Sequence, residues 1–143
     1  MKKILKLIAP LLAILVLFTA CSKEKTKEFI NSSNGHELKT TLYYKGEVVN
    51  KSITVDTIID NKYNLTVEFV QQALQRSIGN ISGYTYNVED NNGKITITYV
   101  IDYNKLDFDK AKSALAIPAN SLEEARKLST ITKNMEEKGF KEK

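Results

Sequence analysis

The 143-residue sequence has no tryptophan, one cysteine, one histidine and two prolines. A single cysteine excludes a scaffold held together by disulfides, and a single histidine with a single cysteine excludes metal sites built from several of these residues. Hydrophobic residues make up 42% of the chain and charged residues 27%, which is typical of a globular domain and not of a disordered chain. Length and composition therefore predict one small folded domain with no metal or other cofactor.

The first twenty residues have the order of a secretory signal peptide. Three lysines at positions 2, 3 and 6 precede an uninterrupted apolar run over residues 7–18, and the small residues Thr19 and Ala20 follow it. A helix of twelve residues is roughly 18 Å long, whereas the hydrocarbon core of a bilayer is about 30 Å thick. We therefore expect residues 1–20 to be a signal peptide and not a transmembrane anchor.

The only cysteine follows this segment directly. The sequence Leu-Phe-Thr-Ala-Cys that ends at Cys21 resembles the lipobox of bacterial lipoproteins, with Phe18 where the pattern usually has leucine. The resemblance implies cleavage after Thr19 and Ala20 and attachment of acyl chains to the Cys21 thiol. Each buried methylene of an acyl chain contributes roughly 0.8 kcal/mol, so two or three chains hold a protein on a membrane. The alternative is a buried cysteine that happens to follow an apolar stretch.

The formal charge of +4 changes when the signal peptide is set aside. Removal of its three lysines from the 21 basic residues leaves 18 against 17 acidic residues, on a chain of 123 residues. A nearly neutral domain has no broad basic surface for phosphates, so we expect no nucleic-acid partner. Lysine outnumbers arginine by 19 to 2, which is typical of an AT-rich genome and points to a Gram-positive bacterium.

The segment after Cys21 is mostly polar. Residues 22–35 are rich in serine, lysine, glutamate and asparagine, and Phe29 and Ile30 are their only apolar residues. This composition predicts that residues 21–36 are the lipidated cysteine and a flexible tether, followed by a single domain over residues 37–143. His36, at the end of the tether, is expected to be an ordinary surface histidine, because no second histidine or thiol could share a metal with it.

Alternating apolar residues predict two β-hairpins. The first runs over residues 38–44 and 49–59 around a Lys-Gly-Glu turn, and the second over residues 84–88 and 95–101. The second hairpin turns at Asn92-Gly93, a strong signal for a tight hairpin turn. The apolar face of the first hairpin is expected to hold Leu38, Thr40, Leu42, Tyr44, Val49, Ile53, Val55 and Ile59.

Three helices are predicted from the remaining pattern. The first is capped by Asn64 and ends at Gly79, and the second is a short helix over residues 107–116 that Pro118 stops. The third begins with a capping box over residues 121–124 and ends at Gly139 followed by Phe140, in the manner of a Schellman motif. The buried side of the first helix is expected to hold Val67, Phe69, Val70, Ala73, Leu74 and Ile78, and that of the third Leu122, Ala125, Leu128, Thr132 and Met135.

The element order is therefore ββαββαα. It predicts an α+β fold with a four-stranded, mainly antiparallel sheet and helices packed on one face. The other face can remain in water, and the alternation assigns to it Thr41, Tyr43, Thr85, Thr96 and Thr98.

Four short segments of the domain carry a further signal. They are Tyr43-Tyr44-Lys45-Gly46, Gly79-Asn80-Ile81-Ser82-Gly83-Tyr84-Thr85-Tyr86, Ile101-Asp102-Tyr103-Asn104-Lys105-Leu106-Asp107 and Glu137-Lys138-Gly139-Phe140-Lys141-Glu142. In their order and spacing these segments resemble the YehR-type bacterial lipoproteins, a family of small envelope proteins. The resemblance extends from about residue 37 to the end of the chain, implies an α+β fold and supplies no catalytic residues.

Few residues point to chemistry. The acidic run from Asp102 to Asp109 lacks the glycine and the final carboxylate of a calcium loop, and the serines lack a nucleophile elbow and a second histidine as base. The carboxylate pairs Asp56 with Asp60 and Glu89 with Asp90 are the candidates for acid–base chemistry. Tyrosine combines an apolar ring with a polar tip, and Tyr43 is the best exposed candidate for a ligand surface.

These observations predict a non-enzymatic protein, lipid-anchored on the extracytoplasmic face of the cell membrane, that binds a protein, peptide, glycan or small ligand. Two alternatives remain. One is a hydrolase of envelope polymers that uses two carboxylates, and the other is a signal peptide that gives a secreted pheromone from residues 12–20. The oligomeric state is open.

Overall fold

The computed structural model describes residues 23–143, so the predicted signal peptide, Thr19, Ala20 and Cys21 lie outside the described residues. The described chain forms a six-stranded sheet with the order β4-β5-β3-β2-β1-β6, in which all neighbours are antiparallel. The strands are β1 (Lys25–Ser33), β2 (His36–Lys45), β3 (Val48–Ile58), β4 (Tyr84–Asn91), β5 (Lys94–Asp102) and β6 (Lys141–Glu142).

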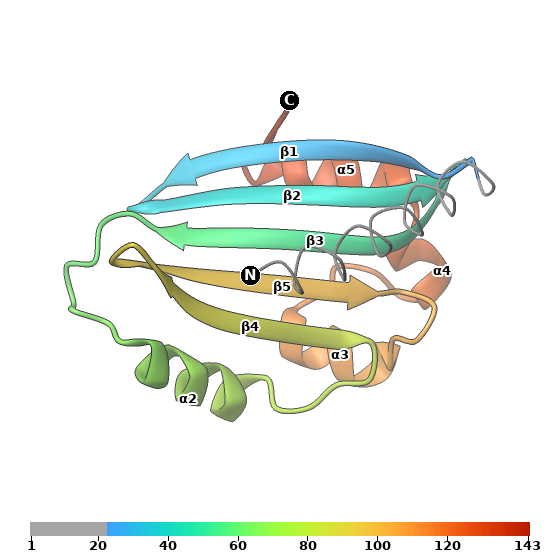
Figure 1. Cartoon of the computed structure of the whole chain (residues 1–143). Helices are drawn as coiled ribbons and strands as arrows, with labels where there is room; N and C mark the ends of the chain where they lie inside the picture. The colour runs from blue at the N-terminus through green and yellow to red at the C-terminus, as the bar shows by residue number, and fades with distance from the viewer. Residues whose placement is uncertain (1–22) are drawn as a thin grey trace, which may run out of the picture.

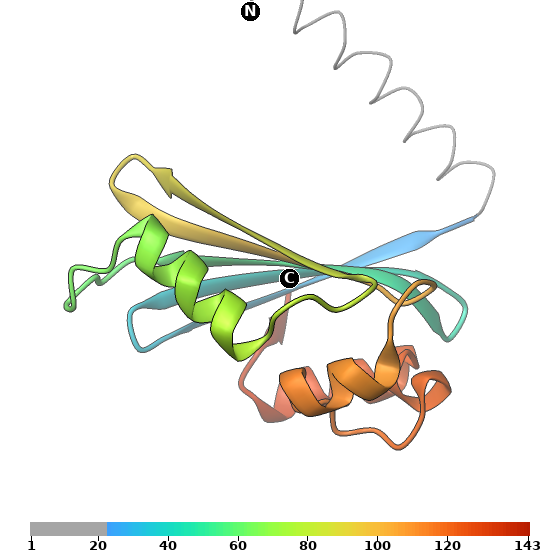
Figure 2. The same ribbon diagram turned by 90° about the horizontal axis from the view of Figure 1, so that it is seen from below.

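Four helices lie on one face of this sheet, which we call the covered face, and leave the opposite face open (Figures 1 and 2). They are α2 (Val67–Ser77), α3 (Phe108–Leu115), α4 (Leu122–Ala125) and α5 (Leu128–Glu137). The predicted α+β class, the antiparallel sheet and the helices on one face are confirmed. The predicted number of four strands is wrong, because β1 and β6 add to the sheet.

Strand β1 occupies most of the segment expected to be a tether. It pairs with β2 over all nine residues, and the Phe29 side chain is fully buried opposite Thr40. One buried aromatic side chain gives no apolar alternation, so local sequence could not reveal the strand. On its other side β1 pairs with β6, and the backbone N–H of Lys143 donates to the Glu28 carbonyl at 2.9 Å. The folded domain therefore begins at residue 25 and not at residue 37.

A β-bulge in β3 changes which side chains face the core. Tyr44 pairs with Val49, but Tyr43 pairs with Lys51, so Asn50 is an extra residue in β3. An extra residue reverses the alternation of the strand beyond it. Val49 is therefore buried as expected, but residues 53, 55 and 59, which were also expected on the apolar face, are not. Residue 59 is 47% exposed. Residues 53 and 55 face the open side, which also holds the predicted residues Thr41, Tyr43, Thr85, Thr96 and Thr98.

The second hairpin forms as predicted. Asn91 pairs with Lys94, and Asn92 and Gly93 both have positive φ, as a two-residue type I′ turn requires. Alternation places Tyr84, Tyr86 and Tyr99 on the covered face, where the Tyr84 ring stacks on that of Tyr99 with centroids 6.3 Å apart.

Helix α2 starts two residues later than predicted. Its N-cap is Thr66, whose Oγ1 accepts a hydrogen bond from the Phe69 N–H at 3.2 Å, whereas Asn64 has a positive φ in the preceding loop. Val70 is buried against the sheet, but Phe69 is 59% exposed. The buried side of the helix is therefore narrower than predicted. Gly79 follows the helix with a φ of +69°, as expected.

The helix predicted from Ser121 is interrupted. Its start is confirmed, because Ser121 Oγ accepts from the Glu124 N–H at 3.1 Å, and so is its end at Gly139 and Phe140. Between them, Lys127 forms a bridge with Val48, and the Leu128 N–H donates to the Glu47 carbonyl at 2.8 Å. These contacts with the β2–β3 hairpin divide the segment into α4 and α5.

The core has two parts. One lies between the sheet and α3, α4 and α5, with Phe29, Leu42, Val49 and Tyr103 at its centre. The other lies beneath α2, with Ile58, Val70, Val88, Ile95 and Ile97. Within residues 23–143 no helix is long and apolar enough to cross a membrane.

Candidate functional site

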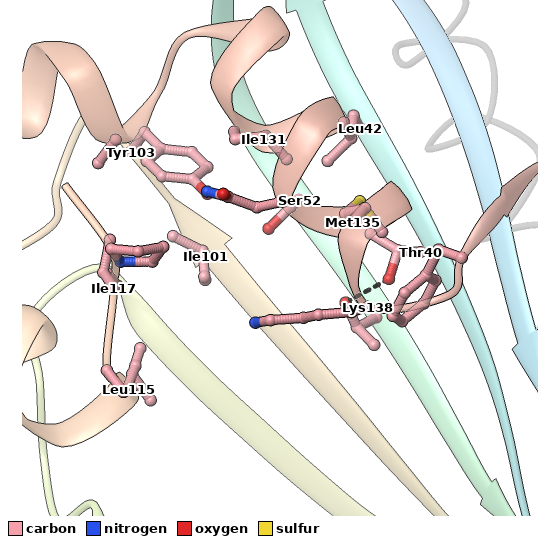
Figure 3. Close-up of a pocket in the computed structure, with 16 residues that line it drawn as sticks. Thr40, Leu42, Ser52, Ile101, Tyr103, Leu115, Ile117, Ile131, Met135 and Lys138 are labelled. Atoms are coloured by element: carbon pink, nitrogen blue, oxygen red, sulfur yellow. Dashed lines mark hydrogen bonds between the residues drawn. The ribbon is translucent and has the colours of Figure 1, made fainter. Parts of the chain in front are cut away.

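A cavity of about 270 Å³ lies between the covered face and the segment from α3 to α5 (Figure 3). Strands β2, β3 and β5 form its floor, and its walls come from the end of α3, the loop that follows and α5. The walls are mostly apolar. The large hydrophobic side chains of floor and walls together are Leu42, Ile101, Leu115, Ile117, Ile131, Met135 and Phe140.

Hydroxyl groups on the floor are largely satisfied within the protein. Thr40 and Thr54 are cross-strand partners, and their Oγ1 atoms lie 2.9 Å apart in a hydrogen bond (Figure 3). Burial raises the pKa of Tyr103, while its hydrogen bond with the Ser52 side chain and the nearby Arg126 charge oppose that rise. The floor therefore has a few polar atoms that are held in fixed positions by their partners, in an apolar setting of the kind that small-molecule sites have.

Lys138 is the charged residue of the lining. Its side chain extends along the cavity towards Ile101 and Ile117 (Figure 3). Among residues 23–143, none of the ion pairs within 4.0 Å involves its ammonium group. The cation is therefore available to an anionic group on a bound molecule.

The end of α5 fixes the position of Lys138. The N–H groups of Gly139 and Phe140 both donate back into the helix at 3.0 Å, to the carbonyls of Glu136 and Met135, which is the Schellman pattern. The Asn31 side chain on β1 also donates to the Lys138 carbonyl at 3.2 Å. The same turn places Phe140 in the cavity wall.

His36 is not the isolated tether residue that the sequence suggested. It is the first residue of β2, and its Nδ1 lies 2.9 Å from Oδ1 of Asp56 on β3. Asp56 is 9% exposed, whereas the imidazole is partly in solvent. The buried carboxylate fixes the orientation of the ring through this contact, but neither residue lines the cavity.

The carboxylate pairs singled out in the sequence do not form a two-carboxylate site. Asp60 is exposed and pairs with Lys62 at 3.3 Å, whereas Asp56 is the one buried carboxylate of the described chain. Glu89 accepts from Asn87, and Asp90 accepts from the Gly93 N–H in the hairpin turn. In the same part of the chain, no three histidine, cysteine, aspartate or glutamate side chains are placed to hold a metal ion.

Tyr43 lies on the open face, as predicted. The Lys51 ammonium sits 5.0 Å from the centre of its ring, so a cation from the next strand already covers part of the tyrosine. Whether Tyr43 contacts a ligand stays a prediction.

Sequence reasoning missed the cavity because its walls come from residues distant in the chain. Of the helical residues in its lining, Ala125 and Met135 had been assigned to the buried side of the helix predicted from Ser121. The one local signal was Ile117 directly before Pro118, an apolar residue outside any helical pattern. Ala116, with a φ of +51°, turns the chain so that Ile117 reaches the cavity.

The chain is similar to known proteins along most of its length. Residues 25–141 match the family described as "Protein of unknown function (DUF1307)". The "Uncharacterized lipoprotein Lin0239" of Listeria innocua is 27% identical over 133 residues, which cover 89% of this chain and 87% of the relative. The "Uncharacterized lipoprotein Lmo0207" of Listeria monocytogenes is also 27% identical, over 139 residues, with the same coverage.

Two solved structures share the fold. The NMR structure of the E. coli YehR protein is 26% identical, with a TM-score of 0.69 over 85% of this chain and 91% of that one. An NMR structure of a protein from Streptococcus pneumoniae TIGR4 is 17% identical, with a TM-score of 0.56 over 84% of this chain and 85% of the other.

Proposed function

Since the chain belongs to the DUF1307 family of YehR-like lipoproteins, we propose that it is a lipid-anchored envelope protein that binds a small ligand in the cavity beside α5. Cys21 would carry the acyl chains, after cleavage behind Thr19 and Ala20. Support for the anchor comes from the lipobox and from the relatives named lipoproteins. The role is binding and not catalysis.

One observation carries the binding role, namely a concave, mostly apolar cavity with few polar groups. Small-molecule sites have this character and typically measure about 300–1,000 Å³. A volume of about 270 Å³ is near the lower limit of that range, so the ligand is small. Lys138 adds a cation that has no ion-pair partner among residues 23–143 and can therefore pair with an anionic group of the ligand. The expected ligand is a small molecule with an apolar body and one anionic group.

Two dyes with the same ring skeleton test this class. 8-Anilinonaphthalene-1-sulfonate has an apolar body and a sulfonate, whereas N-phenyl-1-naphthylamine lacks the sulfonate. We expect residues 23–143, which contain every described element, to bind both dyes with a rise in fluorescence and to bind the anionic one more tightly. Cooperative thermal unfolding of each variant checks that it is folded.

Two substitutions locate the binding. Ile117→Trp fills the cavity and should abolish binding of both dyes, whereas Ile30→Trp on the open face is the matched control and should leave binding unchanged. Lys138→Met should remove the preference for the sulfonate, a loss of up to about fivefold for one exposed ion pair. Unchanged dye binding in Ile117→Trp would refute the cavity as the site.

The anchor has its own test. In cells, the Cys21→Ala protein should be neither acylated nor cleaved before residue 21. Mass spectrometry of the wild-type N-terminus should find acyl chains on Cys21. A Cys21→Ala protein that is still cleaved there would contradict the lipid anchor.

A further inference from the structure

The distance between the lipid site and the folded domain is short. Strand β1 begins at Lys25, which is paired with Tyr44, and the Glu24 carboxylate already accepts from the Asn50 side chain at 3.5 Å. Cys21 lies three residues before Glu24, and consecutive Cα atoms are 3.8 Å apart. The Cα of Glu24 is therefore at most about 11 Å from that of Cys21, whatever path the chain takes.

One end of the sheet carries this attachment. The start of β1 lies at the same end as the tip of the β2–β3 hairpin and α4, while the β4–β5 turn lies at the opposite end (Figure 1). Pairing of Lys25 with Tyr44 and the bridge between Val48 and Lys127 confirm this arrangement. We call residues 45–48 with residues 122–127 the anchor end.

The anchor end has a mixed surface. Val48 is 46% exposed and lines a shallow hollow together with Leu122. Glu47 and Glu123 on the rim are balanced by Arg126 and Lys127. Such a surface has some apolar area and no strong charge of one sign, so it can rest on lipid headgroups without a need for anionic lipid.

We propose that the anchor end lies against the headgroup layer of the membrane that holds the acyl chains of Cys21. This inference rests on the lipid anchor of the proposed function. The eleven residues of β3 span roughly 35 Å, so the other end of the sheet stands well away in water. The loop that follows β3 lies at this distant end (Figure 1), and Tyr63 within the loop is 85% exposed.

The absence of tryptophan gives a direct test, because any introduced tryptophan is the only one in the chain. Val48→Trp reports on the anchor end, and Tyr63→Trp reports on the distant end, where the side chain is more exposed. Each lipidated, full-length processed protein is placed in phosphatidylcholine vesicles that contain a nitroxide-headgroup lipid. Tryptophan quenching is then compared with quenching in vesicles without the nitroxide.

We expect several-fold stronger quenching for Val48→Trp than for Tyr63→Trp. Equal quenching in proteins that remain on the vesicles would overturn the orientation alone and leave the anchor intact. Failure of the wild-type protein to remain on the vesicles would overturn the anchor and this inference together. Lys45→Trp, at the exposed last residue of β2, replaces Val48→Trp if that variant does not fold.

The length of the segment between Cys21 and β1 provides a second test of the orientation. A flexible glycine–serine insertion between Lys23 and Glu24 should remove most of the quenching difference, because the lengthened chain no longer holds the anchor end at the membrane. An unchanged difference would show that the short chain does not cause the orientation.

Discussion

Val49 and Arg126 bind each other in both directions. The Val49 N–H donates to the Arg126 carbonyl at 2.9 Å, and Nε of Arg126 donates back to the Val49 carbonyl at 3.1 Å. The same guanidinium reaches Asn50 at 3.0 Å and Asn104 at 2.9 Å through Nη2. One side chain therefore joins the bulge of β3, the loop after β5 and the break between α4 and α5.

Loss of this guanidinium should destabilise the domain. Hydrogen bonds from a charged group are worth roughly 1.5–3 kcal/mol, so Arg126→Ala should lower the free energy of unfolding by about 2 kcal/mol or more. Arg126→Lys should recover little, because an ammonium cannot replace the planar set of donors. Urea unfolding of residues 23–143 measures both. Arg76→Ala, at the other arginine of the chain, is exposed on α2 and should change stability little.

The elements predicted correctly from the sequence are those whose signal is local. Asn92-Gly93 specifies its own turn, and Ser121 and Gly139 specify helix ends through bonds within a few residues. The errors involve distant partners. Strand β1 exists because β2 and β6 pair with it, and α4 and α5 separate because Val48 binds Lys127 across the fold.

The same distinction applies to the candidate site. His36 and Asp56 are twenty residues apart, and only the pairing of β2 with β3 brings them together. The bulge at Asn50 could not be predicted from the alternation of apolar and polar residues. A single extra residue does not change the composition of the strand, but it reverses which face each later side chain points to. The cavity depends on both effects, since its floor is set by the register and its walls by α3 and α5.

Gly83 should tolerate no side chain. A Cβ added to Gly83 would lie 2.6 Å from the backbone N and Cα of Leu106, and the φ of Gly83 is +82°. Gly93 has the same φ with nothing within 4 Å, so Gly93→Ala isolates the cost of the backbone conformation, about 1–2 kcal/mol. Gly83→Ala should cost a further roughly 1–3 kcal/mol from the steric clash. Equal thermal stability of the two variants would refute the close approach.

Thr132 provides a stabilising substitution. Its Oγ1 is buried in α5 without a hydrogen-bond partner in the described part of the chain. A buried, unpaired hydroxyl costs roughly 1–3 kcal/mol, and valine has nearly the same shape. Thr132→Val should therefore raise the free energy of unfolding by about 1 kcal/mol. Thr132→Ser keeps the hydroxyl and loses the methyl group, so it should lower stability, and a gain in Thr132→Ser would contradict this explanation.

Alkaline pH should unfold the domain through its buried tyrosines. Burial, with contributions from Tyr99 and Tyr86, raises the pKa of Tyr84, and burial followed by the Asp56 charge raises that of Tyr99. In the unfolded chain a tyrosine loses its proton near pH 10, while the folded protein still holds it. Above that pH the unfolded state binds fewer protons than the folded state. The contribution of these tyrosines to the free energy of unfolding is therefore fully present below about pH 10 and is lost as the pH rises further.

Tyr84→Phe should make this alkaline loss of stability smaller, because phenylalanine has no hydroxyl to ionise. Tyr63→Phe is the matched control at an exposed position and should leave the pH dependence unchanged. Urea midpoints of the wild type and both variants, measured between neutral pH and about pH 11, provide the comparison. The same slope in wild type and Tyr84→Phe would show that the proton on Tyr84 is not coupled to folding. Absorbance of the phenolate followed in parallel should rise together with unfolding, since the buried rings ionise only when the chain opens.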